Sequence, residues 1–176
     1  LVSNLYTVEN RNREYITFDE LEKFSSNLIL IIGSRRSYIR KCLLSDDYLN
    51  AKNEIINFKS IFNHDDLFLE LNFHFEENDE LMINKYIEFA NDHSLNKVVT
   101  NDVHYIENTD FNLFNIARCI SKGVLLSELK DENFTQSEYY LKSENEMLKI
   151  FSSLKDAVDN TRIISERCNV EFDFST

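Results

Sequence analysis

The sequence predicts an α/β fold built on parallel strands, followed by a mostly helical C-terminal part. Three short apolar runs, at residues 28–32, 67–71 and 98–100, are continuous, as is typical of strands buried on both faces. Two segments with helical periodicity, 45–62 and 79–93, separate them. Strands that alternate with helices imply crossovers between parallel neighbours. The order of elements alone fits a barrel and a doubly wound sheet equally well.

Residues 1–27 form a polar N-terminal segment that ends in a short helix. Thr17 and Glu20 have the spacing of a capping box, in which the threonine caps the helix and the glutamate bonds back to it. We therefore predict a helix over residues 18–25. The first strand follows and is expected to end at Gly33.

Apolar spacing identifies the two helices between the strands. The first is expected from Ser45, with Asp46 and Asp47 in its first turn, where the helix dipole favours negative charge. Its apolar face has three- and four-residue spacing and carries Tyr48, Ala51, Ile55, Phe58 and Phe62. The second helix is expected to bury Met82, Tyr86, Phe89 and Ala90.

Beyond residue 105 the pattern is mostly helical. Thr109 or Asp110 can cap a helix that Gly123 ends. Residues 139–142 are expected to be extended. A second capping box then opens a helix over 143–151, and a last helix is expected over 154–167.

Composition limits the functions available to this chain. The net charge of −12 argues against a large phosphate-contacting surface, because nucleic-acid affinity depends on Lys and Arg. A local basic cluster, Arg35, Arg36, Arg40 and Lys41, is explained at least as well by a solvated helix face. No apolar run reaches the roughly 18 residues that a membrane span needs, so we expect no membrane partner. The chain begins at Leu1, which suggests a piece of a longer protein.

Three cysteines, Cys42, Cys119 and Cys168, form no Cys-x-x-Cys pair. An odd number of unpaired thiols is typical of a reduced, cytosolic protein.

Polar residues directly after the third strand are the best candidates for a functional site. Asn101, Asp102 and His104 follow a buried strand, where side chains can turn into one cavity. Carboxylate and neutral imidazole are good ligands for zinc or manganese. The same residue types also cap turns and form ordinary hydrogen bonds, so the motif alone leaves a structural role open.

Several segments together resemble a known family. Val98–Tyr105 is similar to the last metal motif of the polymerase-and-histidinol-phosphatase (PHP) domain, as it occurs in the alpha subunit of bacterial DNA polymerase III. Further segments match the same subunit in the same order: Leu28–Ser34, Leu67–His74, Tyr139–Met147 and Asn160–Glu171. The resemblance implies a partial distorted (βα)7-type barrel. Residues 1–176 would form a single domain, the larger C-terminal part of a PHP domain, with 28–105 as its βαβαβ core and 106–176 as its mostly helical part.

The resemblance also implies a metal site with part of its ligands. Asp102 and His104 match metal ligands of the family, and Ser34 stands where many members carry Cys. Glu70, His74 and Asn101 are further candidates to line the site, although we do not count His74 as a ligand. Serine replaces thiolate poorly, and the family's early His-x-His motif lies upstream of this chain. A divalent metal (Zn, Mn or Mg) is therefore expected in the complete domain and is not expected to be held tightly by this fragment.

The function implied by the resemblance is that of a piece of a DNA-directed DNA polymerase. The domain would have a structural role and dock the proofreading exonuclease subunit, with a truncated or degraded metal site. Its partners would be the rest of the alpha subunit and that exonuclease, and DNA would be bound by the parent enzyme in the bacterial cytoplasm. No catalytic residue for polymerisation is expected in this fragment. Two alternatives stay open: an active metal-dependent 3′–5′ exonuclease or phosphoesterase domain, and a stand-alone PHP phosphatase.

Overall fold

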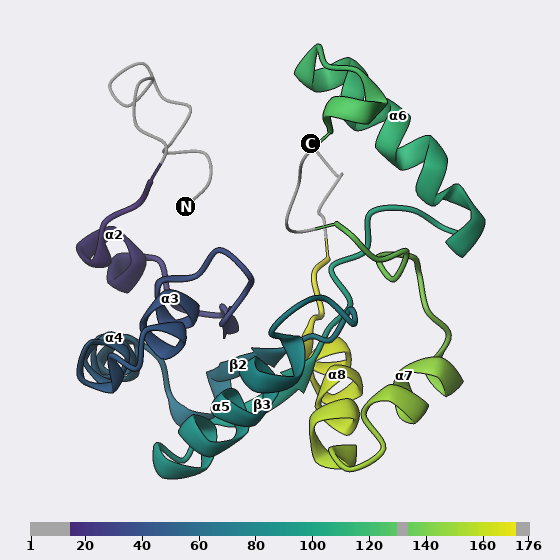
Figure 1. The fold of residues 1–176 in the computed structure, drawn as a ribbon. Coiled ribbons are helices and arrows are strands. Elements are labelled where there is room, and N and C mark those ends of the chain that lie inside the picture. Colours follow the sequence, from purple (N-terminus) through teal and green to yellow (C-terminus); the bar gives the residue numbers. More distant parts are fainter. Residues whose placement is uncertain (1–14, 130–133, 172–176) are drawn as a thin grey trace, which may run out of the picture.

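Three parallel strands form the centre of the chain. The computed structural model describes residues 15–129 and 134–171 (Figure 1), so the first 14 residues of the N-terminal segment lie outside the described residues. The strands are β1 (Leu30–Ile32), β2 (Leu67–Leu71) and β3 (Asn96–Val99), in the order β1-β2-β3 with both pairs parallel. The predicted α/β class with parallel strands is confirmed. A three-stranded sheet does not close a barrel, so the barrel stays a prediction.

Seven helices and three 3-10 turns accompany the sheet in the described residues. The helices are α2 (Phe18–Lys23), α3 (Tyr38–Leu44), α4 (Tyr48–Ile61), α5 (Asp79–Asp92), α6 (Phe111–Lys122), α7 (Glu144–Ile150) and α8 (Lys155–Arg167). The turns are η2 (His64–Asp66), η3 (Asn108–Asp110) and η4 (Leu126–Glu128). The C-terminal part from residue 106 is mostly helical, as predicted. In the described residues, no helix is long and apolar enough to cross a membrane.

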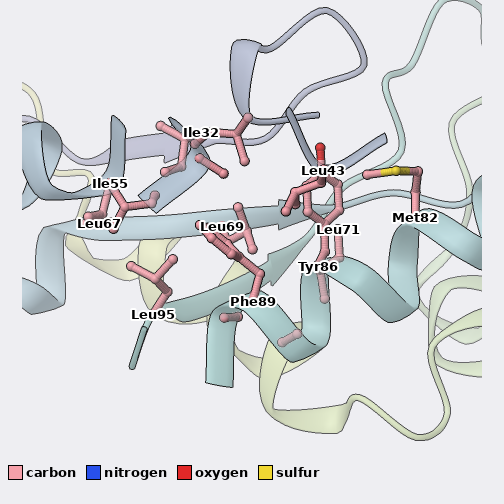
Figure 2. Close-up of a cluster of buried hydrophobic side chains, with 14 of the residues drawn as sticks. Ile32, Leu43, Ile55, Leu67, Leu69, Leu71, Met82, Tyr86, Phe89 and Leu95 are labelled. Atoms are coloured by element: carbon pink, nitrogen blue, oxygen red, sulfur yellow. The ribbon is translucent and has the colours of Figure 1, made fainter. Parts of the chain in front are cut away.

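Side chains on one face of β2 form the core, mainly with helices α3, α4 and α5. Leu67, Leu69 and Leu71 are at most 1% exposed and belong to a cluster with residues from α3, α4 and α5. Figure 2 shows this cluster, with Phe89 of α5 close to Leu69. The opposite face of β2 carries Glu70, because alternate residues of a strand point to opposite sides. One face of the sheet is therefore a packed core, and the other contributes polar groups.

The two outer edges of the sheet differ. Helix α8 packs against β3, and Asn160 of α8 donates a hydrogen bond of 2.8 Å to the carbonyl of Lys97. Strand β1 forms the other edge, and Ile31 at its centre is 41% exposed. An uncovered strand edge offers unpaired backbone groups to a further strand.

The sequence correctly predicted the two helix starts that carry a capping box and the glycine that ends α6. Both capping boxes are present, Thr17 with Glu20 before α2 and Ser143 with Glu146 before α7. Gly123 ends α6 with a φ of +65°, the left-handed conformation that favours glycine.

Other boundaries were wrong. Helix α4 begins at Tyr48 instead of Ser45, because Asp46 has a φ of +58° and Asp47 is the N-cap, accepting from the amide of Asn50 at 3.2 Å. The start of α6, by contrast, was predicted correctly, because Asp110 is its N-cap, although the Asp110 side chain makes no cap bond to this helix. The Asp110 carboxylate accepts instead from the amide of Glu107, the N-cap of η3, at 3.1 Å.

The solvated helix face expected from the basic cluster was also only half right. Arg40 is 8% exposed and faces Asp79, whereas Arg36 and Lys41 are exposed.

Candidate functional site

A cavity of about 320 Å³ lies at the carboxyl ends of the strands. This is the edge of a parallel sheet where α/β proteins build their sites. Loops after all three strands and one later segment contribute its lining: Ser34, Arg35, Arg36, Glu70, Asn72, Asp102, His104 and Phe134. Four residues singled out from the sequence, Ser34, Glu70, Asp102 and His104, are thus brought together although they span 71 positions.

Asp102 and His104 lie close together on the loop that follows β3. The Nε2 atom of His104 is 3.5 Å from Oδ1 of Asp102, and both side chains are partly open to solvent. Asp102 has a φ of +42°, so the backbone turns sharply at this residue. The amide of His104 donates to the carbonyl of Tyr139 at 2.8 Å, which fixes the loop against the segment before α7. The geometry presents a carboxylate and an imidazole to the same space.

Aromatic rings surround the His104 imidazole on its other sides. The centroids of Phe134, Phe114 and Tyr139 lie 4.9, 5.2 and 5.9 Å from its centroid. Such packing limits the orientations of the imidazole. His104 is therefore positioned by packing while one side of it remains accessible.

Glu70 enters the cavity from the polar face of β2. Its carboxylate accepts a hydrogen bond of 2.6 Å from the hydroxyl of Thr100. Burial raises the pKa of Glu70, and the nearby negative charge of Asp102 adds to the effect, although the Thr100 bond opposes it. A carboxyl group with a raised pKa next to a second carboxylate is a common feature of functional sites.

Ser34 occupies the loop after β1, and Gly33 determines how closely that loop approaches β2. Gly33 has a φ of +111°, and a Cβ there would lie 3.1 Å from Cδ1 of Leu69. The hydroxyl of Tyr86 donates to the carbonyl of Gly33 at 2.6 Å and holds the loop from α5. This places the exposed Ser34 at the rim of the cavity.

His74 and Asn101 lie behind the cavity and not in its lining. The His74 side chain is 0% exposed, its Nε2 is 2.8 Å from the carbonyl of Asn101, and its ring stacks on Tyr139 with centroids 4.1 Å apart. The Asn101 amide donates to the carbonyls of Tyr140 at 2.5 Å and Glu138 at 3.3 Å. Both residues join the strand ends to the segment before α7, which is a structural role.

Sequence reasoning missed a buried ion pair beneath the site. Arg35 donates to both carboxylate oxygens of Asp79 at 2.9 and 3.0 Å, and the Asp79 side chain is 1% exposed. Asp79 also accepts from the amides of His74 at 2.8 Å and Glu76 at 3.2 Å. In the sequence, Arg35 stands out only as part of the basic cluster. No local signal marks its partner 44 positions later.

The fit of a divalent metal to this cavity is incomplete. In residues 15–129 and 134–171, no group of three or more His, Cys, Asp or Glu side chains is arranged to hold a metal ion. A structural zinc takes four protein ligands and a catalytic zinc usually three. The serine at position 34 offers only a neutral hydroxyl, and Arg35 and Arg36 bring positive charge to the lining. The described residues therefore do not make a complete metal site.

The protonation of His74 leads to a prediction for stability against pH. Burial lowers the pKa of His74, and the charge of Arg35 adds to this, although the bond to Asn101 opposes it. The unfolded chain therefore binds this proton at a higher pH than the folded chain. The stability that the folded chain gains by keeping His74 neutral is complete above the pKa of the unfolded chain, about 6.5. It is lost as the pH falls toward the pKa of His74 in the folded chain.

Urea unfolding between pH 7.5 and 5 measures this effect. We expect the free energy of unfolding to fall more steeply with acid in the unsubstituted chain than in His74→Gln. The exposed His64→Gln should keep the original slope. Equal slopes in all three proteins would show that the pKa of His74 does not differ between the folded and unfolded states.

Comparison with known proteins identifies the relatives of this chain. No protein-family model matches it. The DNA polymerase III subunit alpha of Borreliella burgdorferi is 31% identical over 157 residues, which are 89% of this chain and 14% of the relative. The same subunit is 30% identical in Buchnera aphidicola, over 97% of this chain and 15% of the relative, and 31% identical in Escherichia coli K12, over 86% and 13%. The chain spans about a seventh of the length of the curated relatives it matches. Over about nine-tenths of its length, it matches one piece of the DNA polymerase III alpha subunit.

Proposed function

We propose that this chain is a segment of a bacterial replicative DNA polymerase and forms the later part of its PHP domain. The observation that supports this most is the match to polymerase III alpha subunits over nearly the whole chain. The cavity at the carboxyl ends of the strands adds to it. Asp102 and His104 meet there, beside Ser34 and Glu70, as expected for a PHP site.

The proposed (βα)7-type barrel is supported by the free edge of the sheet. β1 has one neighbour in the described residues, and its central side chain is exposed. Glu70 and Asn72 point to the polar face, toward which the interior of such a barrel would lie. Additional strands pairing with β1 would cover this edge and bring further side chains to the cavity.

In this account the domain has a structural role and docks the proofreading exonuclease subunit, with a degraded metal site. Ser34 and the two arginines in the lining support the degraded site. The net charge of −12 supports a segment that does not itself hold the DNA. A chromosomal replicase of a bacterium works in the cytoplasm, and that is the location we propose for this chain.

Primer extension by the complete protein that contains this chain tests the proposal. With a primed template, deoxynucleoside triphosphates and Mg²⁺, we expect the primer to lengthen. A folded, complete protein that leaves the primer unextended would contradict the polymerase assignment.

A second candidate function is a metal-dependent 3′–5′ exonuclease in the PHP domain itself. The juxtaposition of Asp102, His104 and Glu70 around one cavity favours it. The complete domain would supply the remaining metal ligands, and this chain would contribute Asp102 and His104. Asp102→Ala and His104→Ala should then each remove the metal-stimulated nuclease activity of the complete subunit. Asp92→Ala, an exposed aspartate at the end of α5, should not change it.

Full metal-stimulated activity in both site variants would eliminate the nuclease hypothesis and leave the structural role. The third alternative, a stand-alone phosphatase, is disfavoured because the relatives that match nearly the whole chain are polymerase subunits.

A further inference from the structure

His74 joins the loops that follow β1 and β3. The Nη2 atom of Arg35, in the loop after β1, lies 3.3 Å from Nδ1 of His74. On the other side of the ring, Nε2 lies 2.8 Å from the carbonyl oxygen of Asn101, in the loop after β3. Asp79 of α5 holds the guanidinium, because its carboxylate accepts from Arg35 at 2.9 and 3.0 Å. We call these four residues, Asp79, Arg35, His74 and Asn101, the His74 relay.

The partners of the His74 ring determine its protonation. A guanidinium can only donate, so Nδ1 of His74 accepts from Arg35 and carries no proton. A carbonyl can only accept, so Nε2 carries the proton and donates to Asn101. A second proton, on Nδ1, would place a donor against a donor and a positive charge beside the guanidinium. The relay is therefore complete only with the neutral imidazole.

The relay ends next to the cavity on both loops. Arg35 directly follows Ser34 in the lining, and Asn101 directly precedes Asp102. Asp102 has a φ of +42°, which is uncommon for a residue other than glycine. The direction of the Asp102 side chain therefore depends on how firmly its neighbour Asn101 is held.

Titratable and charged groups face the His74 ring from each element around it: Arg35 after β1, Glu76 after β2, Asp79 in α5, Asp102 after β3 and Tyr139 before α7. Burial of the ring is the largest effect and lowers the pKa of His74. The charge of Arg35 lowers this pKa further, whereas the charges of Asp79 and Asp102 oppose the shift. The surroundings as a whole therefore favour the neutral ring that the relay needs.

We propose that His74 is a positioning residue for Asp102 and His104, and that protonation of its ring opens the loop that carries them. This deepens the proposed function, on which it rests for the role of the cavity. The neutral ring ties the loop after β3 to Arg35 and orders the cavity. The open loop exposes the ring to water, where its pKa is about 6.5, so acid favours the open form.

Hydrogen–deuterium exchange in the complete protein that contains this chain tests the inference. Exchange is measured at pH 7.5 and pH 5, with labelling times scaled to the intrinsic rate at each pH. The peptide over residues 100–105 is followed, in which the amides of Thr100 and His104 donate to backbone carbonyls. We expect this peptide to exchange about tenfold faster at pH 5, because each pH unit below about 6.5 favours the protonated, open form by up to tenfold.

Peptides over α4 are the control for the rest of the fold, since this helix carries the buried core residues Ala51 and Ile55. They should stay protected at both pH values. Opening of α4 together with the loop would show that the whole domain unfolds in acid, and would overturn the proposal of a local change.

Two substitutions at position 74 separate protonation from packing. His74→Gln keeps a donor and an acceptor but takes up no proton, so residues 100–105 should stay protected at both pH values. His74→Leu fills a similar space without polar groups, so the same peptide should exchange fast at both. Asp102 and His104 are present in all these proteins, so a difference between them comes from position 74.

Equal acceleration by acid in the unsubstituted protein and in His74→Gln would overturn the proposal. Protection in His74→Leu equal to that of the unsubstituted protein would overturn the positioning role. The comparison with His74→Gln decides the pH dependence even where His74→Leu does not fold.

Primer extension with the same preparations separates this inference from the proposed function. An active polymerase whose loop does not respond to pH would contradict only the role of His74. An inactive protein with the expected response would contradict only the polymerase assignment.

Discussion

Replacing Asp79 by alanine is expected to lower the free energy of unfolding by about 3–5 kcal/mol, the cost of breaking a buried ion pair by removing one partner. The Asp79 side chain is 1% exposed and that of Arg35 is 11% exposed, so the guanidinium would be left largely buried without its counter-ion. Two backbone amides, those of His74 and Glu76, would lose their acceptor as well. Urea unfolding of this chain measures the loss.

Glu80→Ala is the matched control for this prediction. Glu80 is the next residue, lies in the same first turn of α5 and is exposed. Its removal should change stability by no more than about 0.5 kcal/mol, as is usual for surface positions. A similar small effect at Asp79 would show that the ion pair beneath the site contributes little to the fold.

Glu76→Ala is expected to release residues 134–139, with a loss of about 1–3 kcal/mol in the free energy of unfolding, because a buried acceptor of several hydrogen bonds is removed. The Glu76 carboxylate is buried and accepts from the amides of Thr135 at 2.8 Å and Gln136 at 3.1 Å. It also accepts from the hydroxyls of Tyr139 and Thr135. These bonds fix residues 134–139, which carry Phe134 to the His104 ring.

Amide hydrogen exchange at Thr135 and Gln136 measures this release directly. We expect at least tenfold faster exchange in Glu76→Ala, and little change in Glu77→Ala, where the neighbouring glutamate is exposed. Unchanged exchange at both amides in Glu76→Ala would show that another contact holds residues 134–139 in place.

Local signals in the sequence predicted the features that depend on contacts between residues close together in the chain. The capping boxes at Thr17 and Ser143, and the left-handed Gly123, depend on groups within a few residues of one another. The continuous apolar runs predicted the three strands. Burial on both faces, which such runs favour, does not hold for β1, where Ile31 is 41% exposed.

The meeting of Ser34 with Asp102 and His104 could also be predicted, because the carboxyl ends of parallel strands share one edge. The contacts that support the cavity could not be predicted. Arg35 pairs with Asp79 over 44 positions, and Glu76 pairs with Thr135 over 59 positions. Neither pairing leaves a periodic or local pattern in the sequence.

His74 illustrates the limit most clearly. Its position after a strand made it a candidate to line the site, yet the structure stacks it on Tyr139 and buries it completely. Only the three-dimensional arrangement shows that Asn101 and His74 support the cavity from behind.

The coding sequence on both sides of this segment tests the central claim most directly. If this chain is part of a polymerase III alpha subunit, the reading frame continues past both ends. It should then encode a His-x-His motif upstream and the paired aspartates of the polymerase palm downstream. A frame that begins near Leu1 and stops near Thr176 would contradict the account, and both the polymerase and the nuclease assignments would have to be withdrawn for this chain.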